Sequence, residues 1–327
     1  MHKAYLALFV AAASATALHV RAETLADAPN PRADTPYEVV PSPPCREKEM
    51  VCRDKVIDFW TSEKMKAAWP AEDFLPPQYP IEPVLDPDAD QAGYTLVHAP
   101  YMDRPLSRFT GILFWRSHDP LVGEELRHCS ASVIHSSSQN LILTAAHCLY
   151  GIKWHDMLMF VPAFDGTYDA PLGKWPIRIA FMPGMDAPGN PQADIAVARV
   201  YSQSSGETLE KTVGGALQPL VNSGELFPLV RDVGYPSKAI SGDGPYHFAE
   251  QRQCDSHTDR GGQYNNLVLL NCSPQPGNSG GPIVAIYSAP VEVVGVFAKT
   301  TPISGQPRLL PETFVPMYKI ADSLSPE

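Results

Sequence analysis

The chain has 327 residues, of which 44% are hydrophobic and 19% are charged. It can therefore bury the core of one large domain or two smaller ones, and a collagenous, coiled-coil or wholly disordered protein is excluded. Its formal charge of −11 disfavours binding to the phosphate backbone of nucleic acids, so we expect no nucleic-acid partner.

Residues 1–22 have the pattern of a secretory signal peptide. An apolar run over residues 4–18 follows Lys3, and Val20-Arg21-Ala22 has the small-x-small pattern of a signal-peptidase site. This run is shorter than the ~20 residues that cross a bilayer, and no later stretch is long enough. We expect a secreted protein, extracellular or periplasmic, without a membrane span; an uncleaved signal anchor is the alternative.

Six cysteines suit the oxidising compartments that exported proteins enter. Zinc binding would need closely spaced pairs of thiolate or imidazole ligands, and that spacing is not found here. We therefore expect disulfides, no metal and no cofactor, although six cysteines can pair in many ways. Their order along the chain groups them as Cys45 with Cys52, Cys129 with Cys148, and Cys254 with Cys272.

Residues 23–104 differ in composition from the rest of the chain, with 13 of the 34 prolines and 16 acidic against 8 basic residues. Proline fixes φ and removes a backbone donor, so extended connectors are expected over most of this segment. One proline-free stretch predicts a short amphipathic helix that docks on another part of the protein. Its apolar residues are Val56, Ile57, Phe59, Trp60 and Met65. We expect a Pro-rich propeptide or N-terminal extension that contacts the rest of the protein; a mobile linker is the alternative.

From residue 109 onward, short apolar runs alternate with Gly, Pro, Asn and Ser, which indicates antiparallel barrels or sandwiches. The runs cover residues 111–115, 131–134, 141–145, 195–200, 268–270, 283–287 and 291–298. Residues 313–324 have apolar side chains at steps of three and four instead. With Thr313 as a possible N-cap, they predict a terminal helix packed on the body.

Three side chains suited to nucleophilic catalysis lie next to apolar runs: His147 after residues 141–145, Asp194 before residues 195–200, and Ser279 before residues 283–287. A serine hydroxyl is a weak nucleophile at neutral pH and needs a base within hydrogen-bond reach. His147 is the candidate base, and Asp194 is the candidate carboxylate that holds its tautomer. Asp186, in a Pro/Gly-rich loop, is the alternative carboxylate.

Glycines surround Ser279 in the segment Gly-Asn-Ser-Gly-Gly-Pro, residues 277–282. Glycine allows a tight turn, so the amides of Gly277 and Ser279 can point together at a developing oxyanion. The sequence therefore predicts both a nucleophile and an oxyanion hole in one turn.

Thr-Ala-Ala-His-Cys at residues 144–148, Asp-Ile-Ala-Val at 194–197 and the 277–282 segment, in that order, resemble the trypsin/chymotrypsin superfamily of serine endopeptidases. The resemblance covers residues 109–324. It implies an all-β domain at 105–327, acyl-enzyme chemistry, and protein or peptide substrates. Within that domain, two antiparallel Greek-key β-barrels are expected at about 105–205 and 206–312, followed by a C-terminal α-helix at about 313–324. The family also commonly has the Cys129–Cys148 disulfide.

Residues 109–114 and 233–236 further resemble the bacterial glutamyl endopeptidase-like branch. Asn278 stands where digestive members carry the aspartate that receives the new N-terminus during activation, so that salt bridge cannot form here. No Ile-Val-Gly-Gly-like start is present either, and Arg104 and Arg108 are candidate processing sites.

The resemblance places Ser273 at the floor of the primary specificity pocket, and Phe297 and Thr300 in its wall. Serine offers no negative charge to an Arg or Lys substrate side chain. Phe297 stands where glutamate-specific members carry a histidine. We therefore expect a neutral or apolar substrate side chain before the scissile bond.

Two other functions fit parts of this pattern. A catalytically silent homologue that acts as a binding module usually lacks a triad member, and none is missing here. A lipase or esterase normally carries its serine first, in Gly-x-Ser-x-Gly. The remaining histidines, including His128 and His257, are expected in loops or at the surface.

Overall fold

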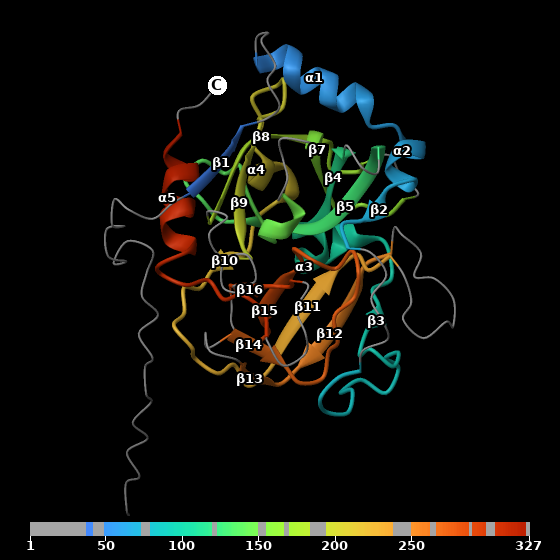
Figure 1. Ribbon diagram of the computed structural model, residues 1–327, viewed down its shortest axis with the longest axis vertical. Helices are drawn as coiled ribbons and strands as arrows, with labels where there is room; N and C mark the ends of the chain where they lie inside the picture. The colour runs from blue at the N-terminus through green and yellow to red at the C-terminus, as the bar shows by residue number, and fades with distance from the viewer. Residues whose placement is uncertain are drawn as a thin grey trace, which may run out of the picture.

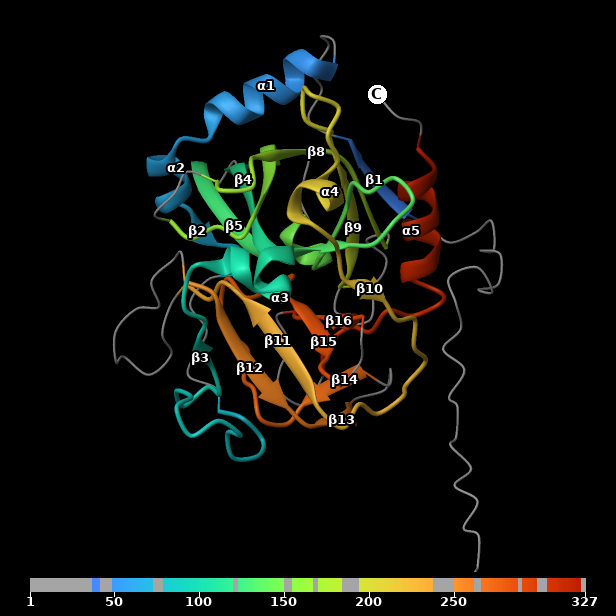
Figure 2. The same ribbon diagram turned by 180° about the vertical axis from the view of Figure 1, so that it is seen from behind.

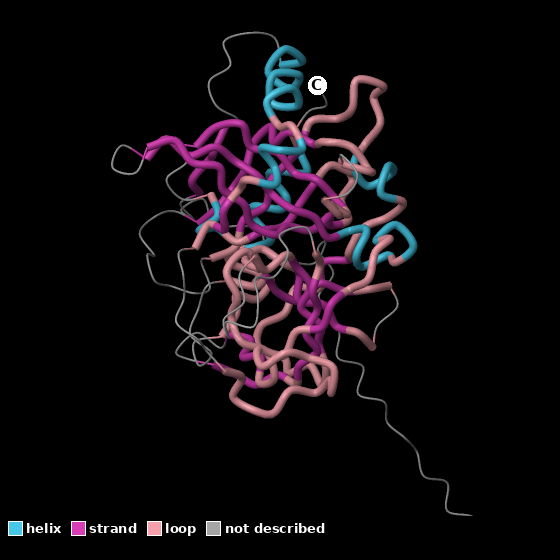
Figure 3. The backbone as a smooth tube through the Cα atoms, turned by 90° about the vertical axis from the view of Figure 1, so that its right-hand side faces the viewer, coloured by secondary structure: helices cyan, strands magenta, loops and turns pink. Residues whose placement is uncertain are grey.

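The sheets of the protein form two halves, one above the other in the view of Figure 1. This computed structural model describes residues 37–41, 49–72, 79–119, 123–149, 155–166, 170–183, 194–237, 250–261, 266–287, 290–298 and 305–324. The signal-peptide prediction and Asp186 lie outside these residues. The view from the side shows the helices against the upper half, while the lower half consists of strands and loops (Figure 3).

The upper half is a closed antiparallel barrel, with six strands among the described residues. The strands are β4 (Thr110–Asp119), β5 (Gly123–Ile134), β6 (Leu141–Thr144), β7 (His155–Pro162), β8 (Trp175–Pro183) and β9 (Ala196–Val200). They pair in the order β8-β7-β4-β5-β6-β9, and the ring closes because β8 also pairs with β9. The predicted apolar runs become strands buried on both faces, such as β6 and β9.

Two short strands from the N-terminal part of the chain extend this sheet. The strand β1 (Tyr37–Pro41) pairs antiparallel with β8, and β2 (Trp69–Pro70) pairs parallel with β5. The barrel therefore carries N-terminal residues at two of its strands.

The lower half is a six-stranded sheet in the described part of the chain. Its order is β10 (Gln218–Pro219), β16 (Glu292–Val296), β15 (Pro282–Ala285), β11 (Val230–Gly234), β12 (Arg252–Ser256) and β3 (Thr95–Leu96). All neighbours are antiparallel except β10 and β16. A hairpin of β13 (Thr258–Gly261) and β14 (Asn266–Leu269) completes this half. The predicted all-β fold is confirmed: the first half is a closed barrel, and the described residues of the second half form a sheet and a hairpin.

The predicted C-terminal helix is α5 (Phe314–Ser323), which packs against β9 and β8. Its buried residues include Phe314, Met317, Tyr318 and Ala321. Thr313 occupies the N-cap position, but its side chain makes no capping hydrogen bond. Arg199 satisfies the other end, because its Nη1 donates to the carbonyls of Ala321 at 3.0 Å and Leu324 at 2.8 Å.

The predicted amphipathic helix is two helices, α1 (Glu49–Phe59) and α2 (Ser62–Lys66), along the outside of the barrel (Figure 2). Trp60 lies between them and is fully buried. Its indole N–H donates to the Met157 carbonyl at 2.5 Å, and its ring centroid is 5.2 Å from that of Phe114. Met65 is also buried. This part of the N-terminal segment is thus docked on the barrel.

Residues 92–104 join the lower half instead. Tyr94 is fully buried, and Val97 and Tyr101 are nearly so. β3 pairs with β12, and the short helices η1 (Tyr101–Asp103) and α3 (Pro105–Phe109) lead into β4. The change of composition near residue 104 therefore does not coincide with the point where the chain joins the sheets. A further helix, α4 (Leu209–Val213), lies between β9 and β10.

Two predicted disulfides are confirmed, Cys129–Cys148 and Cys254–Cys272. Cys52 is also disulfide-bonded, but Cys45 lies outside the described residues, so the Cys45–Cys52 pairing stays a prediction. No helix in the described ranges is long and apolar enough to cross a membrane.

Candidate active site

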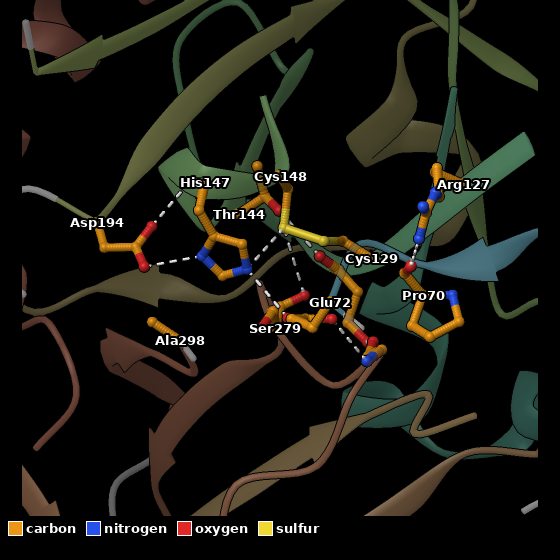
Figure 4. A network of polar contacts seen from close by, with 12 residues as sticks. Pro70, Glu72, Arg127, Cys129, Thr144, His147, Cys148, Asp194, Ser279 and Ala298 are labelled. Atoms are coloured by element: carbon orange, nitrogen blue, oxygen red, sulfur yellow. Dashed lines mark hydrogen bonds and ion pairs between the residues drawn. A yellow bond between two sulfur atoms is a disulfide. The ribbon is translucent and has the colours of Figure 1, made fainter. Parts of the chain in front are cut away.

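His147 and Asp194 are brought together by the pairing of β6 with β9. Thr144 ends β6 and pairs with Ala196, the first residue of β9. His147 follows on the short helix η2 (Ala146–Cys148). Asp194 Oδ2 lies 2.8 Å from His147 Nδ1, and Oδ1 accepts the His147 backbone N–H at 2.8 Å (Figure 4). Both carboxylate oxygens thus hold the imidazole, with Nε2 facing away from Asp194.

The turn that carries Ser279 leads into β15 and requires glycine on both sides of the serine. Gly277 has φ of +82°, and a Cβ there would lie 2.7 Å from the Tyr235 carbonyl oxygen. Gly280 has φ of +87°, and a Cβ there would lie 2.0 Å from the Ser130 carbonyl oxygen. A side chain at either position would displace the turn, because these neighbours are backbone atoms.

Ser130 on β5 holds the serine turn against the barrel. Its amide donates to the Ser279 carbonyl at 2.7 Å, and its hydroxyl donates to the Gly277 carbonyl at 2.9 Å. The neighbouring Cys129 is bonded to Cys148, the residue after His147. One disulfide therefore links the strand that supports Ser279 to the helix that carries His147.

A buried polar cluster anchors the same turn in the lower half. The Asn278 side-chain amide and the Tyr94 hydroxyl both donate to Asp232 Oδ2, the latter at 2.8 Å. Asp232 is fully buried, and burial raises the pKa of its carboxyl to about 7 despite the hydrogen bonds from Tyr94 and Asn278. Nothing in the sequence indicated this role, because Asp232 follows Arg231 in Val-Arg-Asp-Val-Gly, a pattern that does not distinguish a buried carboxyl from an exposed one.

Glu72, from the N-terminal segment, occupies the space in front of His147 and Ser279. Its Oε1 lies 3.0 Å from His147 Nε2, and its Oε2 accepts the Gly277 amide at 3.0 Å. The Glu72 side chain is only 2% exposed. Glu72 could not be recognised from the sequence, because one glutamate among 16 acidic residues of a Pro-rich segment has no distinguishing pattern around it.

The charges of this cluster stabilise one another. Burial alone would lower the pKa of His147, but Asp194 and then Glu72 raise it to about 10. Burial alone would raise the pKa of Glu72, but the imidazole, the Ser279 hydroxyl and the Gly277 amide lower it to about 2. The two carboxylates therefore favour the imidazolium form of His147 at neutral pH. The Ser279 hydroxyl is buried and lies close enough to Glu72 to lower its pKa, but it does not meet the geometry of a hydrogen bond to any described residue.

The expected pocket residues are only partly described. Ser273 is fully buried, and its amide donates to the Ala92 carbonyl at 3.0 Å. Phe297 is buried next to the serine turn, where its carbonyl accepts the Gly280 amide at 2.7 Å. Thr300 lies outside the described residues. The strand that ends near Phe297 thus runs beside Ser279.

Of the histidines that were expected in loops or at the surface, His257 is an exposed loop residue, whereas His128 is neither in a loop nor exposed. The prediction for His128 was wrong because it lies on β5, fully buried behind the serine turn. A Cβ at Gly277 would lie 2.8 Å from His128 Cε1. Burial lowers the pKa of His128 to about 3, so its ring is neutral.

Comparison with known proteins points to one family. The sequence model of the Trypsin family matches residues 116–323. The fold is similar to that of the thermostable serine protease AL20 from an extremophilic microorganism, with a TM-score of 0.54 and 21% identity, over 68% of this chain and 100% of that one. No curated protein sequence matches the chain.

Two other solved structures are similar. The protease Anisep from Arthrobacter nicotinovorans has a TM-score of 0.52 and 21% identity, over 68% of this chain and 98% of its own. A Glu endopeptidase has a TM-score of 0.52 and 19% identity, over 74% of this chain and 99% of its own. At these identities the likeness is one of fold.

Proposed function

The chain belongs to the trypsin family, and we propose that it is an exported serine endopeptidase that cleaves peptide bonds through an acyl-enzyme on Ser279. The superfamily resemblance of the sequence motifs is confirmed. Export is supported by the signal-peptide pattern of residues 1–22 and by the two disulfides. The observation that carries the proposal is that both carboxylate oxygens of Asp194 bind His147, which leaves Nε2 on the side where Ser279 and Glu72 lie.

In the proposed reaction, Ser279 Oγ attacks the substrate carbonyl carbon while its proton moves to His147 Nε2. The carbonyl oxygen becomes an oxyanion, which the amides of Gly277 and Ser279 stabilise. The Gly277 amide already binds an anionic oxygen in the structure, that of Glu72. The C–N bond then breaks, and the departing amine takes the proton from Nε2.

Water completes the cycle by the same steps in reverse order. His147 takes a proton from water, and the resulting hydroxide oxygen attacks the acyl carbon. The bond to Ser279 Oγ then breaks, and Ser279 recovers the proton from Nε2. Asp194 stabilises the imidazolium in both halves of the reaction and keeps the tautomer that presents Nε2 to the reacting atoms.

For substrate preference, we propose a neutral or apolar side chain before the scissile bond. Ser273 and Phe297 carry no charge and both are buried, and the Phe297 carbonyl accepts the Gly280 amide of the serine turn. A peptide library digested by the active protein and analysed by mass spectrometry tests this. Cleavage confined to bonds after Arg, Lys or Glu would contradict it.

The second candidate function is a silent homologue that only binds a partner. It is favoured by one observation, the Glu72 carboxylate that occupies His147 Nε2 and the Gly277 amide in this structure. Labelling with a fluorophosphonate separates the two, because this reagent reacts only with an activated serine. An endopeptidase is labelled at Ser279 once the site is open, and Ser279→Ala is not.

A further inference from the structure

The contacts of Glu72 have a consequence for how the proposed activity is controlled. We propose that residues 69–72 are an internal inhibitor, and that the enzyme becomes active when Glu72 leaves a site that is already assembled. The inference rests on the proposed function of this site. Glu72 occupies both the nitrogen that must accept the Ser279 proton and an amide that must bind the oxyanion.

Glu72 blocks the chemistry in two ways. A substrate carbonyl oxygen cannot reach the Gly277 amide while Glu72 Oε2 accepts that hydrogen at 3.0 Å. An imidazole that is held in its protonated form cannot act as a base. The carboxylate beside Nε2 favours that form, in line with the raised pKa of His147.

The inhibitor uses the same complementarity that catalysis needs. In the tetrahedral intermediate, the site holds an anionic oxygen at its amides and an imidazolium at His147. Glu72 places one carboxylate oxygen at the Gly277 amide and the other at His147 Nε2, where it pairs with the imidazolium. A site built to stabilise this pattern of charge therefore binds a well-placed carboxylate.

The edge of β5 holds residues 69–72 in place. β2 pairs parallel with β5, and the Ala71 amide donates to the His128 carbonyl at 2.9 Å. Arg127 Nη1 donates to the Pro70 carbonyl at 2.8 Å. Glu125 orients this guanidinium, accepting from Arg127 Nε at 2.9 Å. Backbone pairing thus fixes the chain one residue before Glu72.

The segment is also anchored on both sides of Glu72. Upstream, Trp60 and Met65 are buried against the barrel. Downstream, the Glu82 amide donates to the Leu270 carbonyl at 2.8 Å, and the Asn271 side-chain amide donates to the Pro83 carbonyl at 2.7 Å. The described residues just before Glu72 therefore contact the upper half, whereas Glu82 and Pro83 contact the lower half.

The catalytic geometry does not depend on Glu72 for its support. The serine turn is held by Ser130 and, through Asn278, by Asp232. Asp194 holds His147 from the opposite side of the ring. Removal of the Glu72 carboxylate should therefore expose a site that is already formed. Activation by a new N-terminus would work differently, because it needs a negative charge at position 278, and Asn278 has none.

The test compares the rate of fluorophosphonate labelling in the full chain, with residues 23–327 present and no proteolysis. Variants Glu72→Gln and Glu72→Ala should be labelled on the order of 100-fold faster than wild type, because the charged hydrogen bonds that hold the carboxylate in the site are lost. Glu72→Gln keeps the size of the side chain, so it controls for misfolding of Glu72→Ala. Glu82→Gln is the matched control in the same segment, since its side chain is exposed, and it should react like wild type.

Equal labelling of wild type and both Glu72 variants would overturn the internal inhibitor and leave the proposed enzyme intact. The proposed function would be refuted, and the inhibitor with it, if all variants and the proteolysed wild type were folded but none reacted. Thermal unfolding of each variant shows whether it is folded.

Discussion

The two carboxylates that flank His147 have the same charge and similar distances but come from different regions. Asp194 precedes β9 of the barrel and contacts Nδ1 at 2.8 Å, whereas Glu72 follows β2 and contacts Nε2 at 3.0 Å. On the Asp194 side, the contact leaves the proton-accepting nitrogen available. On the Glu72 side, it occupies that nitrogen. The contacted atom, rather than the type of residue, decides whether a carboxylate supports or blocks the site.

The largest expected effect comes from removing the nucleophile. In the Glu72→Gln background, Ser279→Ala should lower kcat/KM for a peptide substrate by about 10⁶-fold, because no covalent intermediate can form. Adding His147→Ala should change little, since the two residues act as one unit. Additive losses in the double variant would argue against a shared step.

Removing charge on either side of His147 should have effects of opposite sign. In the Glu72→Gln background, Asp194→Asn should lower kcat by ~10⁴-fold, because the imidazole loses its tautomer and its charge partner. Glu72→Gln alone should raise the rate relative to wild type. Steady-state kinetics on the four combinations measures both. If Asp194→Asn also raised the rate, the assignment of the two sides would be reversed.

A smaller effect is expected from weakening the contacts that hold residues 69–72 on the barrel than from changing Glu72 itself. Arg127→Met removes the donor to the Pro70 carbonyl, a charged hydrogen bond worth ~1.5–3 kcal/mol. Labelling of the full chain should then rise by roughly tenfold. In the Glu72→Gln background the same change should have no effect on the rate. A rate change there would mean that Arg127 acts on the catalytic groups instead.

The smallest expected effect concerns Asp232 under the serine turn. Its pKa is raised to about 7 in the folded protein and is about 4 when unfolded. The folded state therefore loses stability as pH rises from about 4 to about 7, where the buried carboxyl ionises. Asp232→Asn still accepts the Tyr94 and Asn278 hydrogen bonds, so it should remove this loss. Urea unfolding at pH 4 and pH 8 measures it, and an equal pH dependence in both proteins would contradict the buried ionisation.

The sequence predicted those parts of the site that come from local motifs. An apolar run adjoins each of His147, Asp194 and Ser279. These runs form buried strands, which fix where the three residues lie. The glycines at 277 and 280 were recognisable because only glycine fits a turn with positive φ against backbone atoms. The helix at 314–323 followed from its apolar spacing.

Contacts between segments distant in sequence could not be predicted in this way. Glu72 lies 75 residues from His147 and 205 from Gly277, and nothing in its neighbours distinguishes it from other acids of the segment. Tyr94 likewise lies in a Pro-rich stretch that predicts a connector, although it supports Asp232. His128 follows polar residues on β5, which gave no sign that its ring would be buried.

The pKa of His147 tests most directly whether Asp194 and Glu72 both bind its ring. In Ser279→Ala protein, which cannot cleave itself, NMR titration of the His147 ring should show an imidazolium that persists to about pH 10. Adding Glu72→Gln should lower that pKa, because the charge at Nε2 is gone while Asp194 remains. The same pKa in both proteins, or a value near the ordinary 6.5 with Glu72 present, would contradict this arrangement.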